Sequence, residues 1–209
     1  YHIFGNHDGN GLRDFRAEIY ALAKEYPHFK VNEYGVKIGD MLFTHGDLQE
    51  TTLRRSDRDR DYQNGLPMGV RKRDLSGDGI EKSTKLLTYF YEMLANPERA
   101  AEFKILRHGE AEARALTVEE LKTTPYIAFA HTHRGHGMTE ITVPAGEESA
   151  THQVMNTGSF TTNITLPEHL WPAALYFCEG KLRETHRAFP ATERWGDMVQ
   201  TMRGTIALS

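Results

Sequence analysis

The sequence predicts an α/β fold with a helical insert, and three observations support this prediction. Short apolar runs with β propensity end in polar loop residues at 1–4, 41–44 and 126–130. Helical periodicity follows the first of these runs at 12–26. A charge-rich stretch at 50–122 lacks strand-like alternation and separates the β-rich segments. Buried strands that deliver polar residues at their ends are typical of α/β sheets with a site at one edge.

The elements before residue 50 follow from local pattern. Residues 12–26 carry apolar side chains at helical spacing, and Pro27 is a stop signal for that helix. Residues 29–38 and 41–44 are expected to be strands. Gly39-Asp40 between them is a two-residue turn signal, so we expect a β-hairpin.

The charge-rich region is expected to be mostly helical. Periodicity predicts a helix over 80–95, whose core face is Leu86, Leu87, Phe90, Tyr91 and Leu94. Residues 97–106 and 110–122 are further helical candidates. Thr117 and Glu120 have the spacing of a capping box.

Strand character returns after residue 122, with candidates at 126–130, 140–143, 153–156, 173–177 and 181–186. The predicted organisation is therefore a core of residues 1–49 and 123–190, a helical insert or cap of residues 50–122, and a C-terminal tail of residues 191–209.

Composition excludes some classes of function. The 209 residues carry a net charge of −4, which argues against a general nucleic-acid-binding surface. No apolar run approaches the roughly 20 residues that a membrane helix needs. The single cysteine fits a reducing compartment, and no secretory signal is visible. These features lead us to expect a cytoplasmic protein.

Histidines stand at the ends of predicted strands. Asn6-His7 follows the first strand, His45 follows 41–44, and His131 and His133 follow 126–130. Alternate residues of extended chain share a face, so His131 and His133 can reach one locus. Imidazole and amide donors without thiolate suit a catalytic transition-metal site. Each motif alone is also compatible with a polar turn or a structural histidine.

The order of these motifs resembles that of calcineurin-like metallophosphoesterases. Gly5-Asn6-His7-Asp8, then His45-Gly46, then Ala130-His131-Thr132-His133 are similar to the family's third, fourth and fifth motifs. Asn156-Thr157-Gly158-Ser159 is similar to the family's usual ending. The resemblance implies a β-sandwich flanked by helices, in four α/β/β/α layers.

The resemblance also implies an activity, which is hydrolysis of a phosphomonoester or phosphodiester at a dinuclear metal centre with a bridging hydroxide as nucleophile. Asn6, His45 and His131 would bind one metal and His133 the other. His7 would donate a proton to the leaving group, and Asp8 would orient that region. The implied cofactors are two divalent or transition ions (Mn, Fe, Zn or Ni), with Mn favoured. The implied substrate is a phosphorylated small molecule or nucleotide.

Two family motifs, Asp-x-His and Gly-Asp-x-x-Asp, do not occur in the expected place and are expected upstream. Without them the chain would be a catalytically incomplete phosphoesterase-like binding or scaffold module, which is the alternative hypothesis. Ala130 also stands where the family usually has glycine.

Basic residues near the histidines are candidates for substrate binding. Arg134 and His136 follow the His pair closely and are candidates for phosphate contact. The arginines of residues 54–60 alternate with Asp57 and Asp59, which favours a solvated mixed-charge surface.

Overall fold

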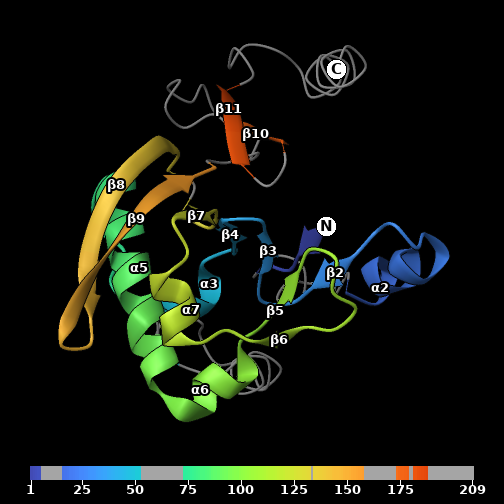
Figure 1. Ribbon diagram of the computed structural model, residues 1–209, viewed down its shortest axis with the longest axis horizontal. Helices are drawn as coiled ribbons and strands as arrows, with labels where there is room; N and C mark the ends of the chain where they lie inside the picture. Colours follow the sequence, from blue (N-terminus) through green and yellow to red (C-terminus); the bar gives the residue numbers. More distant parts are fainter. Residues whose placement is uncertain (6–15, 53–72, 133, 158–172, 179–180, 188–209) are drawn as a thin grey trace.

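The structure is a computed structural model, and it describes residues 1–5, 16–52, 73–132, 134–157, 173–178 and 181–187. These residues form a mixed α/β structure around a seven-stranded mixed sheet (Figure 1). The predicted α/β class is therefore confirmed. Within the described residues, no helix is both long and apolar enough to cross a membrane.

The order of strands in the main sheet determines which loops meet. That order is β6 (Arg114–Ala115), β5 (Lys104–Arg107), β3 (Val36–Ile38), β4 (Met41–Phe43), β7 (Tyr126–Phe129), β9 (Glu148–Asn156) and β8 (His136–Ala145). The neighbours β4, β7 and β9 run parallel to one another. Parallel neighbours end at the same edge of a sheet, so the residues that follow these three strands lie together.

The predicted hairpin around Gly39-Asp40 is confirmed, because β3 and β4 pair antiparallel with Ile38 opposite Met41. The single strand expected over 29–38 is wrong, since it divides into β2 (Val31–Asn32) and β3. The Asn32 side-chain oxygen accepts hydrogen bonds from the backbone N–H groups of Tyr34 at 2.9 Å and Gly35 at 2.8 Å. These hydrogen bonds between the side chain and the nearby backbone stabilise a turn that interrupts the strand.

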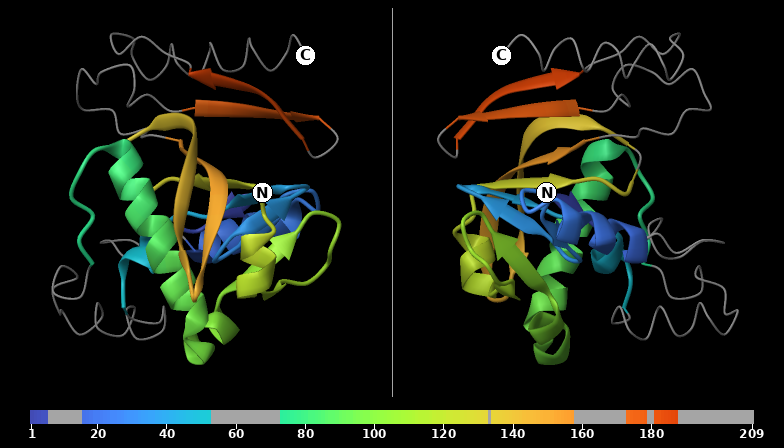
Figure 2. Two further views of the ribbon diagram at one scale, coloured as in Figure 1. Left: turned by 60° about the vertical axis from the view of Figure 1, so that its left-hand side comes forward. Right: turned by 90° about the vertical axis from the view of Figure 1, so that its right-hand side faces the viewer.

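The predicted helix over 80–95 is confirmed as α5 (Gly79–Ala95), and its five predicted core residues are buried. Asp78 caps it in a capping box with Glu81. The helix α5 lies along β8 and β9 and also contacts α3 (Asp47–Glu50) (Figures 1 and 2). Its buried face joins the sheet residues in one large hydrophobic cluster.

Of the helices expected over 97–106 and 110–122, only the parts 97–102 and 118–122 are helical. Residues 97–122 form α6 (Pro97–Glu102), β5, β6 and α7 (Val118–Lys122). Ile105 is fully buried in β5, which pairs parallel with β3, so pairing with a distant strand overrides the local helical pattern.

Thr117 caps α7 as expected, because its hydroxyl accepts from the Glu120 N–H at 3.0 Å. The Glu120 carboxylate, however, accepts from Arg107.

The described part of the region expected to be an insert, residues 50–52 and 73–122, thus adds two strands to the sheet, and both α5 and α7 contribute residues to the core. The division of the chain into a core, a cap and a tail stays a prediction, and the tail of residues 191–209 lies outside the described residues.

Peripheral elements complete the fold. The strand β1 (His2–Ile3) pairs parallel with β2. The helix α2 (Arg16–Glu25) confirms the helix expected before Pro27 over its described part, although none of its residues is buried. The strands β10 (Ala173–Cys178) and β11 (Lys181–Arg187) confirm the last two strand predictions and form an antiparallel pair.

A buried Tyr–His pair joins α5 to the sheet. The Tyr91 hydroxyl lies 2.7 Å from His152 Nε2, and His152 Nδ1 lies 2.7 Å from the Thr124 carbonyl oxygen. A carbonyl only accepts, so Nδ1 carries the proton and Nε2 accepts from Tyr91. Burial lowers the pKa of His152, while the bond to Thr124 partly opposes this. The neutral form of His152 is therefore part of the folded core.

This pair predicts that stability falls in mild acid. The folded pKa of His152 lies below the ordinary value of about 6.5, so between the two values the unfolded chain binds more protons than the folded chain. The stabilisation is complete above pH 6.5 and is lost as the pH falls through the folded pKa. Urea denaturation from pH 8 to 5 should show this loss of unfolding free energy. In His152→Gln the unfolding free energy should depend less steeply on pH. His28→Gln, at an exposed histidine, is the matched control; an equal reduction in both variants would contradict the assignment.

Candidate functional site

Two of the predicted metal ligands meet at the shared edge of β4, β7 and β9. His45 follows β4 and His131 follows β7. Backbone bonds join the two loops, from Thr44 N to Ala128 O at 3.1 Å and from Ala130 N to His45 O at 3.1 Å. The His45 and His131 rings consequently lie 5.1 Å apart between centroids, at 57°. The parallel pairing of β4 and β7 is what brings together two residues 86 positions apart.

Gly5, the first residue of the first motif, lies at the same place. A Cβ atom on Gly5 would lie 2.4 Å from His45 Nε2 and 2.5 Å from its Cδ2, so the His45 ring packs directly on the Gly5 backbone. Phe4, just before it, is fully buried, and its N–H donates to Asn32 O at 3.2 Å. Asn6, His7 and Asp8 lie outside the described residues. Gly5, the described residue of this motif, is itself in contact with His45.

Gly46 permits close packing between the two histidine loops. Its φ is +109°, a backbone conformation that glycine adopts without strain. A Cβ atom here would lie 3.3 Å from His131 Cβ and 3.2 Å from Leu86 Cδ1. The glycine after His45 is thus needed both for its backbone angle and for the approach of His131 and α5.

His131 itself has a left-handed backbone, with φ +57°, which is uncommon for a residue with a side chain. Such a conformation costs on the order of 1–3 kcal/mol and persists where surrounding contacts impose it. Here the fully buried Asn156 imposes it, donating from Nδ2 to Ala130 O at 2.9 Å and to Thr132 Oγ1 at 3.1 Å. Asn156 at the end of β9 therefore fixes the turn that presents His131.

The short helix α3 places a carboxylate beside each histidine, which the sequence reasoning missed. Asp47 Oδ1 lies 3.3 Å from His45 Nδ1, and Glu50 Oε2 lies 2.7 Å from His131 Nε2. Asp47 and Glu50 are three positions apart, so they share a face of the helix. The signal in the sequence is two acidic residues within the five positions after His45, although residue 50 also begins the charge-rich region expected to be an insert.

Arg134 and His136, the candidates for phosphate contact, have different surroundings. Arg134 is exposed, and its backbone N–H donates to Thr132 Oγ1 at 3.3 Å. His136 is buried, with Nδ1 2.7 Å from Gly137 O and Nε2 2.8 Å from Ser83 Oγ. The Nε2 contact joins β8 to α5, and the Nδ1 contact stays within β8. A phosphate contact by His136 stays a prediction that this geometry does not favour, whereas Arg134 remains accessible.

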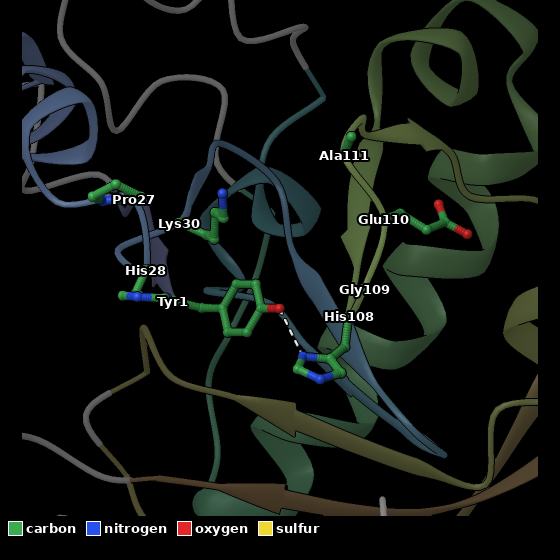
Figure 3. A pocket seen from close by; sticks show the side chains of 8 residues that line it. All are labelled: Tyr1, Pro27, His28, Lys30, His108, Gly109, Glu110 and Ala111. Atoms are coloured by element: carbon green, nitrogen blue, oxygen red, sulfur yellow. Dashed lines mark hydrogen bonds between the residues drawn. The ribbon is translucent and has the colours of Figure 1, made fainter.

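A pocket of about 470 Å³ lies elsewhere, lined by Tyr1, Pro27, His28, Lys30, His108, Gly109, Glu110 and Ala111 (Figure 3). Tyr1 Oη lies 2.7 Å from His108 Nδ1 within it. His108 follows β5, which runs parallel to β3 and thus opposite to β4. The pocket is therefore at the other edge of the sheet and contains none of the residues expected from sequence to form the site.

The geometry of the histidine pair is compatible with a metal ligand role. His45 Nδ1 is buried, and its approach to Asp47 is not that of a hydrogen bond, so it has no hydrogen-bond partner among the described residues. A buried polar atom without a partner costs about 1–3 kcal/mol, which a bound ion would offset. Across the described ranges, no three His, Cys, Asp or Glu side chains are grouped to hold a metal by themselves, and the expected ligands Asn6 and His133 lie outside those ranges.

Comparisons with family models, curated proteins and solved structures return no match.

Proposed function

We propose that this chain contributes to the metal centre of a calcineurin-like phosphoesterase that hydrolyses a phosphomonoester or phosphodiester of a small molecule or nucleotide. The observation that supports the proposal is the convergence of Gly5, His45 and His131, since these residues belong to the three motifs on which the resemblance rests. The four-layer β-sandwich belongs to the same proposal, and the mixed seven-stranded sheet is compatible with it only at the level of α/β class.

In this proposal Asn6, His45 and His131 hold one metal ion and His133 holds the second, with manganese favoured. Two such ions, when bound, stabilise charge on a phosphoryl group and supply a nucleophile at neutral pH. The chain's own contribution is a rigid donor set. His45 is held against the Gly5 backbone, and His131 is held by the turn that Asn156 fixes.

The remaining roles concern the substrate. His7 protonates the leaving oxygen, a step for which an imidazole near neutral pH is well suited. Asp8 orients that loop. Arg134, exposed beside the His131 turn, offers a guanidinium to the substrate phosphate.

The test measures metal content and hydrolysis together. The protein encoded by the natural reading frame that contains these residues is purified, its metals are quantified, and aryl phosphate mono- and diesters are assayed with added Mn²⁺. His45→Ala and His131→Ala should each lose bound metal and lower kcat/KM by more than about 100-fold, since even residues that only orient metal ligands contribute about 10–100-fold. His108→Ala, at an exposed histidine on the opposite edge, should change neither.

Two results would contradict the proposal in different ways. Absence of bound transition metal together with absence of Mn-dependent hydrolysis would remove it entirely. Stoichiometric metal without any hydrolysis would instead support the alternative, a phosphoesterase-like binding module.

A further inference from the structure

We propose that Glu50 is a positioning residue for the metal centre, and that its carboxylate holds His131 in the tautomer whose Nδ1 faces the metal. This inference rests on the proposed function, because it assigns Glu50 a role toward a His131 that binds metal. Glu50 lies outside the motifs that carry the family resemblance.

The contact between the two side chains is close and largely shielded from water. Glu50 Oε2 and His131 Nε2 are 2.7 Å apart, and the two side chains are 12% and 8% exposed. The residues are 81 positions apart, so only the fold brings them together. In such surroundings an ion pair or charged hydrogen bond is screened far less than at the surface.

Glu50 is held on a fixed support. All four residues of α3 are buried, and Leu48 belongs to the main hydrophobic cluster. The Leu48 carbonyl accepts from Arg99 Nη2 at 2.7 Å, and the Glu50 carbonyl accepts from Arg73 N at 2.8 Å. Because its backbone is anchored on both sides, the Glu50 carboxylate meets His131 from a defined direction.

The chemistry of the pair determines which nitrogen can bind metal. An imidazole that binds a metal gives the lone pair of one nitrogen to the ion and keeps a proton on the other, and Nε2 is the nitrogen that faces the Glu50 carboxylate at 2.7 Å. A neutral imidazole protonated at Nε2 has its lone pair on Nδ1, and that atom becomes the metal ligand. Carboxylates that accept from the distal N–H of a metal-binding histidine fix its orientation and increase its basicity.

Glu50 is assigned this role rather than that of a direct ligand because of the contact itself. Oε2 and Nε2 face each other at hydrogen-bond distance. Two atoms that ligate one metal would instead both direct lone pairs at the ion. The two roles predict different consequences for the same substitutions.

The experiment uses the natural-length protein, with Mn²⁺ and Co²⁺ alone as probes. Metal affinity is measured by calorimetry for Glu50→Ala, Glu50→Gln and the control Glu112→Gln, at an exposed glutamate. Glu50→Ala should raise the Kd about 10–100-fold. Glu50→Gln should raise it less, because the amide oxygen still accepts from Nε2–H, and Glu112→Gln should not change it. The visible spectrum of bound Co²⁺ should keep its band positions and intensities in both Glu50 variants.

A second readout needs no metal and no activity. Long-range ¹H–¹⁵N NMR of the histidine rings should show His131 protonated at Nε2 in the metal-free wild type and in Glu50→Gln. In Glu50→Ala this preference should be lost. Thermal melting of each variant checks that it folds. If Glu50→Ala does not fold, the near-isosteric Glu50→Gln is compared with the wild type instead.

The outcomes separate this inference from the proposed function. If the wild type binds no metal, the proposed function fails and the inference fails with it. Wild-type binding with unchanged affinity and tautomer in the Glu50 variants would overturn the inference alone. The inference would also be overturned if the Co²⁺ spectrum changed and Glu50→Gln bound metal as weakly as Glu50→Ala. That result would indicate that Glu50 is itself a ligand.

Discussion

Gly5→Ala is expected to raise the Kd for metal more than about 100-fold, because it displaces the His45 ring. The new methyl group would lie 2.4–2.9 Å from three atoms of the His45 ring, well inside van der Waals contact. The backbone has little room to retreat, because Phe4 is fully buried and hydrogen-bonded to Asn32. The ring must therefore turn away, and a ligand so displaced should cost more affinity than the roughly 10–100-fold lost with an orienting residue. Overpacking should also lower the unfolding free energy by about 1–3 kcal/mol.

Calorimetry with Mn²⁺ and urea denaturation measure the two effects of Gly5→Ala. The matched control is Gly137→Ala, since a Cβ atom there meets no heavy atom within 4 Å and its φ lies outside the left-handed region. The control should bind metal as the wild type does. Wild-type metal affinity in Gly5→Ala would mean that the His45 ring position is not used for metal binding.

His7→Ala is expected to slow catalysis by about 100- to 10,000-fold, the range of general acid–base catalysis, while it leaves metal content nearly unchanged. Its basis is the resemblance, since His7 lies two residues after Gly5 and outside the described residues. The two roles separate by measurement: kcat at saturating Mn²⁺ reports proton transfer, and elemental analysis reports metal binding. Loss of metal in His7→Ala would contradict the role of proton donor.

The leaving group provides a sharper control on His7. A phenolate with a low pKa departs without a proton, whereas an alkoxide requires one. The ratio of wild-type to His7→Ala rates should therefore increase from nitrophenyl esters to alkyl esters. A ratio that is the same for all leaving groups would indicate that His7 acts in another step, such as substrate binding.

The elements predicted correctly are those whose pattern is local. The apolar face of α5 repeats every three to four residues, and Gly39-Asp40 marks the β3–β4 turn within the sequence itself. The errors have non-local or side-chain causes. Residues 104–107 became a strand because β3 offers a parallel partner, and 29–38 was broken by the Asn32 side chain. No periodicity in the sequence reports either interaction.

The candidate site divides in the same way. His45 and His131 were predictable because each follows an apolar strand with a recognisable motif, and parallel pairing of β4 and β7 then brings them together. Glu50 was not predictable, because its partner is 81 residues away and no local pattern links the two side chains. Asn156 was noted only as part of the family's ending, and its hydrogen bonds to the His131 turn come from the fold.

The sequence alone determined the α/β class, the strand ends that carry histidines, and the phosphoesterase hypothesis, because these depend on hydrophobic periodicity and short motifs. Only the tertiary structure decided that Gly5 lies under the His45 ring, that His131 has a left-handed backbone fixed by Asn156, and that Glu50 meets His131. The reason is physical. These contacts join segments far apart in the chain, and their geometry depends on how the parallel strands, α3 and α5 pack, which no local pattern of residues specifies.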